Sequence, residues 1–334
     1  STMLFILVLG IGFWLGVVKH PVPANTINYP GSRQVSNVVN KYGFSIWEPP
    51  ERSYTLVSKT SFANGGKVIT GFNRHASKHL NGYLFCFDND FKEIWKVHLV
   101  ESLKFGDNAY SEFYNIIPLE IKDFNHDGDY ELVVLVAHNY FPRKILVLNE
   151  DGEILSHYYH SGSVPSLLTA DIVPGNQTEE LIFAGVNNEY GGAILFILDP
   201  FNTEGASPQE NKFYILEGVE RGNELAYMRF PKTEFQTRAN RDAATSLGIV
   251  SGNLNVGVYN HSRVPEKKIL VNYYLDQDLS PTFIGITDNY IRGMQTVFPE
   301  FTSDDSTAIK RQDRLKSVLY WSGESWETTP TLAH

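Results

Sequence analysis

The sequence is short of cysteine and of basic residues, and both shortages exclude classes of protein. Cys86 is the only cysteine among 334 residues, so the chain forms neither an intramolecular disulfide nor an all-cysteine zinc site. The 28 lysines and arginines are outnumbered by 38 aspartates and glutamates, which gives a formal net charge of −10. A chain this acidic has no bulk attraction to phosphate backbones or anionic lipid heads, so we expect no nucleic acid among its partners.

Common catalytic motifs are missing as well. The chain holds no Gly-x-Ser-x-Gly nucleophile elbow, no phosphate-binding glycine loop and no His-Glu-x-x-His motif. His75 and His79 are four residues apart, and His157 and His160 three apart, but both pairs fall in strand or loop sequence, where such spacing defines no common face. Cys86 lies in an apolar run and is expected to be a buried, inert thiol. The sequence therefore predicts no catalytic residue.

Apolar and aromatic residues are plentiful. Hydrophobic residues make up 42% of the chain, and 21 Phe and 18 Tyr accompany 26 Gly and 16 Pro. This composition supports a sizeable core, and it favours strands and turns over helices. We therefore expect a folded protein of the all-β class.

The first 18 residues form a separate hydrophobic segment. Residues 3–18 have no charged side chain, and a helix over 1–18 is about 27 Å long, just short of a hydrocarbon core of about 30 Å. We expect a transmembrane helix that anchors the protein outside the cytoplasm. Two alternatives are a signal segment cleaved near Val22-Pro23-Ala24, which gives a secreted protein, and a buried helix. Residues 19–44 are expected to be a linker and residues 45–334 the folded domain.

A pattern of about 48 residues repeats inside this domain. The segments Asp123–Glu131 and Asp171–Glu179 both begin with Asp and end with Glu, at an offset of 48 residues. The apolar run after Glu131 recurs after Glu180, and Ile145-Leu-Val-Leu recurs as Ile194-Leu-Phe-Ile. Each run has four to eight residues and ends in polar turn residues, which indicates strands.

Looser copies lie on both sides of this pair. Upstream, Leu84–Asp88 and the residues after it have the same strand–turn–strand pattern, and downstream Ser317–Trp321 leads into an expected hairpin at Glu324–Glu327. All-β repeats of this length, with four short strands each, commonly stack around an axis. We predict a β-propeller of five to seven four-stranded blades, preceded by the hydrophobic N-terminal helix; a β-sandwich is the alternative. The expected units are 52–99, 113–162, 165–217, 222–290 and a last one from residue 291.

The first acidic loop has the spacing of a cation site. Asp123, Asn125 and Asp127 place oxygen-bearing side chains at alternate positions, and a glycine follows. The carbonyl of Asp129 and the carboxylate of Glu131 complete five oxygen ligands, which suit calcium better than magnesium. The Asp171 copy lacks the inner ligands, so we predict one calcium ion. The alternative is a polar turn in which Asp and Asn side chains cap backbone amides.

The run from Asp123 through Val134 resembles the FG-GAP or VCBS repeat of integrin-alpha-type β-propellers. In that family the loop joins two strands of a blade and binds calcium, so the resemblance implies the same fold and the same ion here. The match is specific over about a dozen residues and occurs once, and the surrounding unit extends it over residues 113–162.

Two classes of function follow from these observations. The first is a membrane-tethered, extracytoplasmic binding, scaffold or sensor module, stabilised by calcium, for a protein or carbohydrate partner. The second is an extracellular propeller enzyme that acts on polysaccharide in a central channel. Two or three close carboxylates, or a His–carboxylate set, in such a channel would favour the enzyme.

Overall fold

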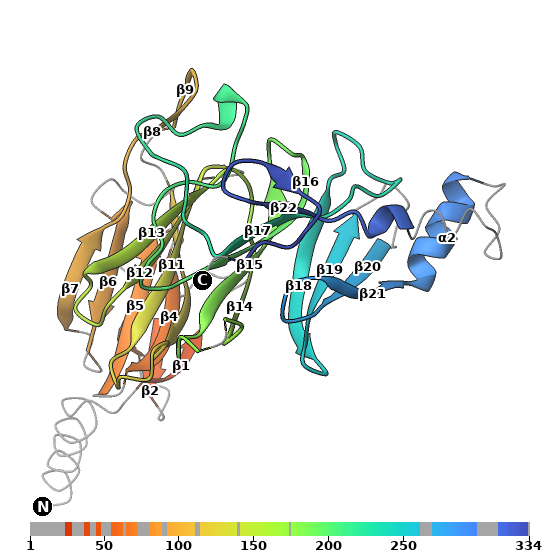
Figure 1. The fold of residues 1–334 in the computed structure, drawn as a ribbon. Helices are drawn as coiled ribbons and strands as arrows, with labels where there is room; N and C mark the ends of the chain where they lie inside the picture. Colours follow the sequence, from red (N-terminus) through yellow and green to blue (C-terminus); the bar gives the residue numbers. More distant parts are fainter. Residues whose placement is uncertain are drawn as a thin grey trace, which may run out of the picture.

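The computed structural model is built mainly from antiparallel sheets (Figure 1), which confirms the all-β class. It describes residues 24–28, 37–40, 45–47, 55–62, 65–72, 80–88, 92–110, 114–138, 141–173, 175–260, 269–298 and 313–332. The expected hydrophobic helix at residues 3–18 lies outside the described residues. None of the sheets formed by the described strands closes into a barrel.

Four sheets follow one another along the chain, and each contains four consecutive strands in sequential order. The first sheet contains β4 (Thr55–Phe62), β5 (Gly65–Phe72), β6 (Tyr83–Phe87) and β7 (Glu93–His98). The second contains β10 (Asn115–Lys122), β11 (Glu131–Ala137), β12 (Arg143–Leu148) and β13 (Ile154–His160). The third contains β14 (Ser166–Ala170), β15 (Glu180–Asn187), β16 (Gly192–Leu198) and β17 (Ala226–Arg229). The fourth contains β18 (Asp242–Val250), β19 (Asn253–Asn260), β20 (Ile269–Leu275) and β21 (Pro281–Ile286).

The end of the chain departs from the expected units. The predicted hairpin is present as β22 (Leu319–Trp321) and β23 (Trp326–Glu327), but these strands do not belong to a fifth unit. They extend the third sheet beyond β17, which was expected in the fourth unit. Local sequence patterns predict a hairpin but not its partner strand, so this assignment needed the structure.

Two smaller sheets accompany these four. Strands β1 (Ala24–Asn28), β2 (Asn37–Asn40) and β3 (Ser45–Trp47) form a three-stranded sheet, so the range 19–44, expected to be a linker, contains two strands. Strands β8 (Leu103–Phe105) and β9 (Asn108–Tyr110) form a hairpin between the first and second sheets in the chain.

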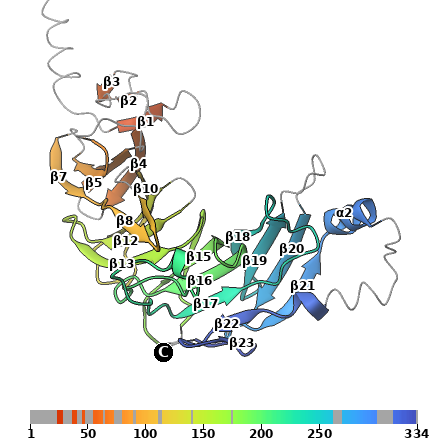
Figure 2. The same ribbon diagram turned by 90° about the horizontal axis from the view of Figure 1, so that it is seen from above.

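The four main sheets are stacked face to face along an arc (Figure 2). Strand β11 shows this most directly, since every one of its residues is buried. Leu132 and its alternate neighbours pack into a cluster with the first sheet, whereas Val133 and its alternates pack into a cluster with the third. Because successive side chains of a strand point to opposite faces, the second sheet is covered on both sides. This explains its continuous apolar runs.

In each of the four main sheets, the third strand is followed by an Asp or Asn that caps the next turn. Asp88, Asn149, Asp199 and Asp276 come directly after β6, β12, β16 and β20. One side-chain oxygen of each accepts a backbone N–H two or four residues later, at 2.8–2.9 Å. This shared turn, an Asx turn, is further support for a repeated unit, and it confirms the strand–turn–strand pattern predicted at Leu84 and Ile145.

The only long helix among the described residues is α2 (Asp288–Val297), which follows β21. The Thr287 side chain accepts the N–H of Tyr290, and Asp288 places a negative charge in the first turn. Tyr290 and Met294 pack into the cluster between the third and fourth sheets. No helix in the described part of the chain is long and apolar enough to cross a membrane.

Candidate functional site

The predicted cation loop connects β10 to β11 at one end of the second sheet. Asp123 accepts the N–H groups of Asp127 and Gly128, at 3.1 and 3.0 Å. Asn125 accepts the N–H of Asp127 at 3.2 Å, and Asp127 accepts that of Asp129 at 2.8 Å. Gly128 has a φ of 99°, which an L side chain rarely adopts. These bonds match the capped turn considered as the alternative to a calcium site.

Glu131 is the buried member of the loop, with 4% of its surface exposed. Its Oε2 accepts the backbone N–H of Phe124 at 3.1 Å. Burial, together with the negative charges of Asp127, Asp123 and Asp129, raises the pKa of Glu131 to about 7. With Glu131, the loop contains four acidic side chains within nine residues.

The second loop, between β14 and β15, also buries a glutamate, and there a neutral side chain bonds to it. Glu180, the first residue of β15, is fully buried and accepts the N–H groups of Ile172 and Val173, at 2.8 and 3.2 Å. Its other oxygen accepts the side-chain amide of Asn176 at 2.6 Å. Glu131 and Glu180 thus hold equivalent positions, and a neutral amide serves the second carboxylate.

The donor chemistry of the first loop fits a hard cation, although no three His, Cys, Asp or Glu side chains of the described residues gather closely enough to hold a metal ion. A carboxylate has about four lone-pair sites, and the capping bonds use only some of them. Asp123, Asn125, Asp127, the Asp129 carbonyl and Glu131 would hold the ion, which would neutralise their charge.

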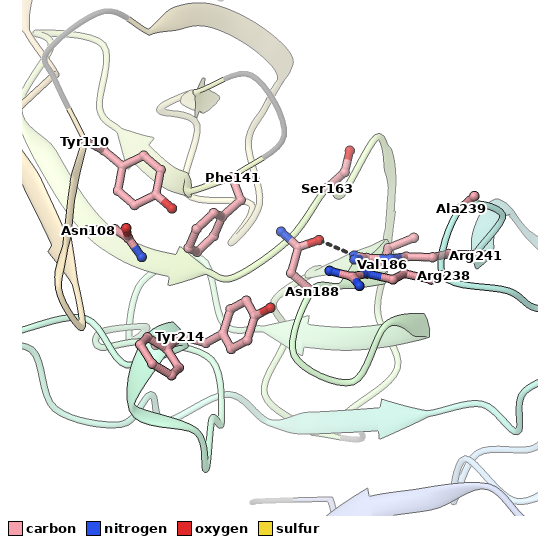
Figure 3. Close-up of a pocket in the computed structure, with 11 residues that line it drawn as sticks. Asn108, Tyr110, Phe141, Ser163, Val186, Asn188, Tyr214, Arg238, Ala239 and Arg241 are labelled. Carbon is pink, nitrogen blue, oxygen red and sulfur yellow. Dashed lines mark hydrogen bonds between the residues drawn. The ribbon is translucent and has the colours of Figure 1, made fainter.

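A pocket of about 610 Å³ lies at the other end of the sheets (Figure 3). Successive connections of an antiparallel meander alternate between its two ends, so the connections after β11, β13, β15 and β17 all lie opposite the acidic loops. Each of these connections contributes to the pocket, together with β9 and the segment between β16 and β17. A pocket of this size is in the range that small ligands occupy.

Four of the residues that line the pocket are aromatic, and Figure 3 shows three of them, Tyr110, Phe141 and Tyr214, on one side. Phe141 is the central ring: its centroid lies 4.9 Å from that of Tyr110 and 5.9 Å from that of Tyr214. The rings meet at 81° and 59°. Burial, and secondarily Tyr214, raise the pKa of Tyr110, so its hydroxyl stays neutral and can donate a hydrogen bond.

Hydrogen bonds fix the segments that carry these rings. The buried guanidinium of Arg143 donates to the carbonyls of His138 and Pro142, which closes the loop around Phe141. Burial lowers the pKa of Arg143 to about 10, so it remains charged near neutral pH. The Glu189 carboxylate accepts the N–H groups of Glu210 at 3.1 Å and of Asn211 at 2.8 Å, and thereby holds η2 (Lys212–Tyr214).

The hairpin β8–β9 is attached to the same segment. Phe105 bridges to Leu216, and the Gly106 N–H donates to the Ile215 carbonyl at 3.3 Å. Gly106 has a φ of 55°, and a Cβ there would lie 2.8 Å from the Lys212 carbonyl oxygen. Only glycine allows this close approach, which sets the position of Tyr110 over the pocket.

The opposite side of the pocket carries two arginines. Arg238 and Arg241 come from the connection between β17 and β18, and Asn188 lies between them and the aromatic rings (Figure 3). Arg241 Nη1 donates to Asn188 Oδ1 at 2.7 Å. The ion pairs formed among the described residues include neither arginine. Both guanidiniums are therefore positioned without a carboxylate partner in this part of the chain.

Charged groups of both signs lie near Arg241. Burial and the positive charge of Arg229 lower the pKa of Lys232, the carboxylate of Asp242 raises it, and Arg241 lowers it. The residues that line the pocket include no Asp, Glu or His. In a chain of net charge −10, this pocket presents a local field of the opposite sign.

Sequence reasoning found the acidic loops but missed the pocket. Tyr110, Phe141, Tyr214, Arg238 and Arg241 come from four separate segments and form no motif. Of the conspicuous groups that it weighed, those that the structure describes do not line the pocket. Cys86 is buried, and so is His160, whose Nε2 lies 2.9 Å from the Tyr227 hydroxyl. His75 and His79 lie outside the described residues.

Comparison with known proteins identifies no family for the chain. No protein-family model matches the chain, and no curated protein does. Among solved structures, the chain is similar to one from the complex of the fission yeast SREBP-SCAP binding domains, with 11% sequence identity, 81% of each chain covered and a TM-score of 0.35.

Proposed function

We propose that the protein is a membrane-tethered, extracytoplasmic β-propeller that acts as a calcium-stabilised binding module. The four consecutive sheets, each containing four sequential strands and stacked face to face with a shared turn after each third strand, support the propeller. The acidic loop between the first two strands of the second sheet supports the FG-GAP or VCBS resemblance. Five to seven blades, of the integrin-alpha type, remain our proposal for the complete ring.

The pocket is the proposed binding site for a protein or carbohydrate partner. The observation that carries this proposal is the combination, in the 610 Å³ pocket, of an aromatic wall with Arg238 and Arg241, which form no ion pair with the described residues. Arg238 is exposed, Arg241 is half-buried, and neither belongs to a hydrophobic core cluster. Aromatic and arginine side chains together are typical of recognition sites.

Calcium has a structural role in this proposal. Asp123, Asn125, Asp127, Asp129 and Glu131 lie at the end of the sheets opposite the pocket, so the ion would not contact the partner. It would offset the repulsion of four acidic groups and hold the β10–β11 connection.

The N-terminal segment supplies the proposed attachment. Residues 3–18 would span the membrane and residues 19–44 would separate the propeller from it; a cleaved, secreted form is the alternative. Flotation of the full chain with lipid vesicles, compared with a variant lacking residues 1–25, tests this part. The attachment is refuted if both float equally or neither floats.

Screening the full chain against glycan and peptide arrays tests the binding function. Tyr214→Ala should weaken the strongest binding at least tenfold, because it removes one ring of the wall. Phe283→Ala is the matched control, since Phe283 is an aromatic residue with 62% exposure outside the pocket. Equal binding by Tyr214→Ala, Phe141→Ala and wild type would show that the site is elsewhere. Release of shortened products from a bound polysaccharide would favour the enzymatic alternative.

A further inference from the structure

We propose that the pocket recognises an acidic oligosaccharide, with sugar rings against the aromatic wall and an acid group on Arg238 and Arg241. This inference rests on the proposed function and specifies its ligand. It assigns one chemical class to a site that otherwise accepts a protein or a carbohydrate.

The arginines specify the charge of the ligand. A guanidinium presents donors in a planar fork that matches a carboxylate or a sulfate in two parallel hydrogen bonds. Arg241 uses Nη1 for Asn188, which orients the guanidinium and leaves its other donors for a ligand. No carboxylate of the described residues pairs with Arg238 or Arg241. An anion in the pocket would therefore displace water and not an existing ion pair.

The aromatic wall specifies flat, partly apolar groups. Tyr110, Phe141 and Tyr214 form a continuous series of rings. A pyranose ring has an apolar face of C–H groups that loses water when it packs on an aromatic ring. Tyrosine also supplies a hydroxyl at the edge of that surface, where a sugar hydroxyl can bond to it.

The remaining polar lining favours a sugar over an acidic peptide. Asn108, Ser163 and Asn188 offer amide and hydroxyl groups that both donate and accept hydrogen bonds. This versatility suits sugar hydroxyls, which also do both. A peptide rich in Asp and Glu would engage the arginines but would leave the aromatic wall with less to cover it.

The test measures binding of defined probes to the full chain by calorimetry. The probes are an oligogalacturonate, the same oligosaccharide with its carboxylates methyl-esterified, a sulfated heparin fragment and an oligoglutamate peptide. We expect the oligogalacturonate or the heparin fragment to bind, and the comparison of the two shows which acid group is preferred. The esterified sugar should bind at least tenfold more weakly than its acidic parent, and raised salt should weaken the acidic probes.

Variants locate the contact. Arg238→Ala with Arg241→Ala should weaken binding of the acidic sugar at least tenfold, and Arg241→Lys, which keeps the charge but loses the fork, should give an intermediate loss. Arg292→Ala, an exposed arginine on α2, is the matched control and should bind like wild type. Thermal unfolding of each variant checks that the fold is intact.

The outcomes separate this inference from the proposed function. Equal affinity for the esterified sugar, or unchanged binding in the double arginine variant, overturns the acidic ligand but leaves a binding pocket if Tyr214→Ala still abolishes the interaction. Tight binding of the oligoglutamate alone overturns the sugar and supports a protein partner. If Tyr214→Ala has no effect on any probe that binds, the proposed site itself is wrong.

Discussion

The two acidic loops show two ways to bury a glutamate at the start of a strand. In the second loop, Glu180 receives two backbone N–H groups and the Asn176 side chain, all from its own segment. In the first, Glu131 receives one backbone N–H and is surrounded by Asp123, Asp127 and Asp129. The second loop thus supplies all three hydrogen bonds to its own glutamate. The first loop places three further carboxylates near its glutamate.

The difference teaches where a cation is needed. Asn176 lies in the sequence where the first loop has Gly128, and its amide donates to the carboxylate that a positive ion would otherwise satisfy. A loop that has lost its inner carboxylates but kept its glutamate can therefore keep its shape. The following predictions test this comparison, from the largest expected effect to the smallest.

Glu180→Ala should lower the free energy of unfolding by about 4 kcal/mol, because it leaves two backbone N–H groups and an amide without their acceptor. Urea unfolding measures this. The control is Asp171→Ala in the same loop, where the exposed side chain should be worth less than about 0.5 kcal/mol. Similar losses in both variants would mean that the loop depends on charge and not on the buried acceptor.

Calcium should raise the melting temperature of the wild type. At a calcium concentration 100 times the dissociation constant, the free energy of unfolding rises by about 2.7 kcal/mol. Asp127→Ala should abolish the rise, and Asp171→Ala should leave it nearly intact. Calorimetry with and without chelator measures the shift. A wild type that does not respond, or an equal loss from the Asp171 change, would make the first loop a capped turn without an ion.

Glu224 is a third buried glutamate. Burial raises its pKa to about 8, and its Oε2 accepts the Tyr158 hydroxyl at 3.2 Å. Because the folded protein binds the proton more tightly than the unfolded chain, stability is greatest below about pH 4.5 for this group and falls as pH rises toward 8. The expected slope is about 1.4 kcal/mol per pH unit. Glu224→Gln should flatten the profile between pH 5 and 8, and an unchanged slope would contradict the assignment.

Asn176→Ala should lower the free energy of unfolding by about 1 kcal/mol, since one side-chain hydrogen bond is lost while both backbone bonds to Glu180 remain. Urea unfolding of this variant beside Glu180→Ala separates the amide from the rest of the loop. A loss as large as that of Glu180→Ala would show that the amide, and not the backbone, holds the carboxylate.

Much of the fold could be predicted because its signals are local. The turn at Asn149 and the strands on either side of it follow from four to eight residues each, and both appear as expected. Helix α2 was not predicted, although Thr287 and Asp288 are good helix-start residues. A segment of ten residues gives a weak helix signal when the surrounding sequence has a strand pattern.

Of the two candidate sites, the acidic loop and the pocket, only the loop was predicted from the sequence. The acidic loop is contiguous, so its spacing is visible in the sequence. The pocket depends on contacts such as Arg241 with Asn188 and Gly106 with Lys212, which join residues far apart in the chain. A single sequence contains no spacing that relates them.

The hairpin β22–β23 also constrains the order in which the protein can fold. Met228 and Arg229 on β17 pair with Tyr320 and Leu319, and the Arg229 guanidinium lies 3.5 Å from the ring centre of Trp326. A ribosome releases β17 long before these partners. During synthesis the edge of β17 therefore stays open while the fourth sheet forms, and an open edge can pair with another nascent chain. Closing it joins segments far apart in sequence, which is intrinsically slow. A chaperone that covered the edge of β17 during synthesis would prevent this pairing.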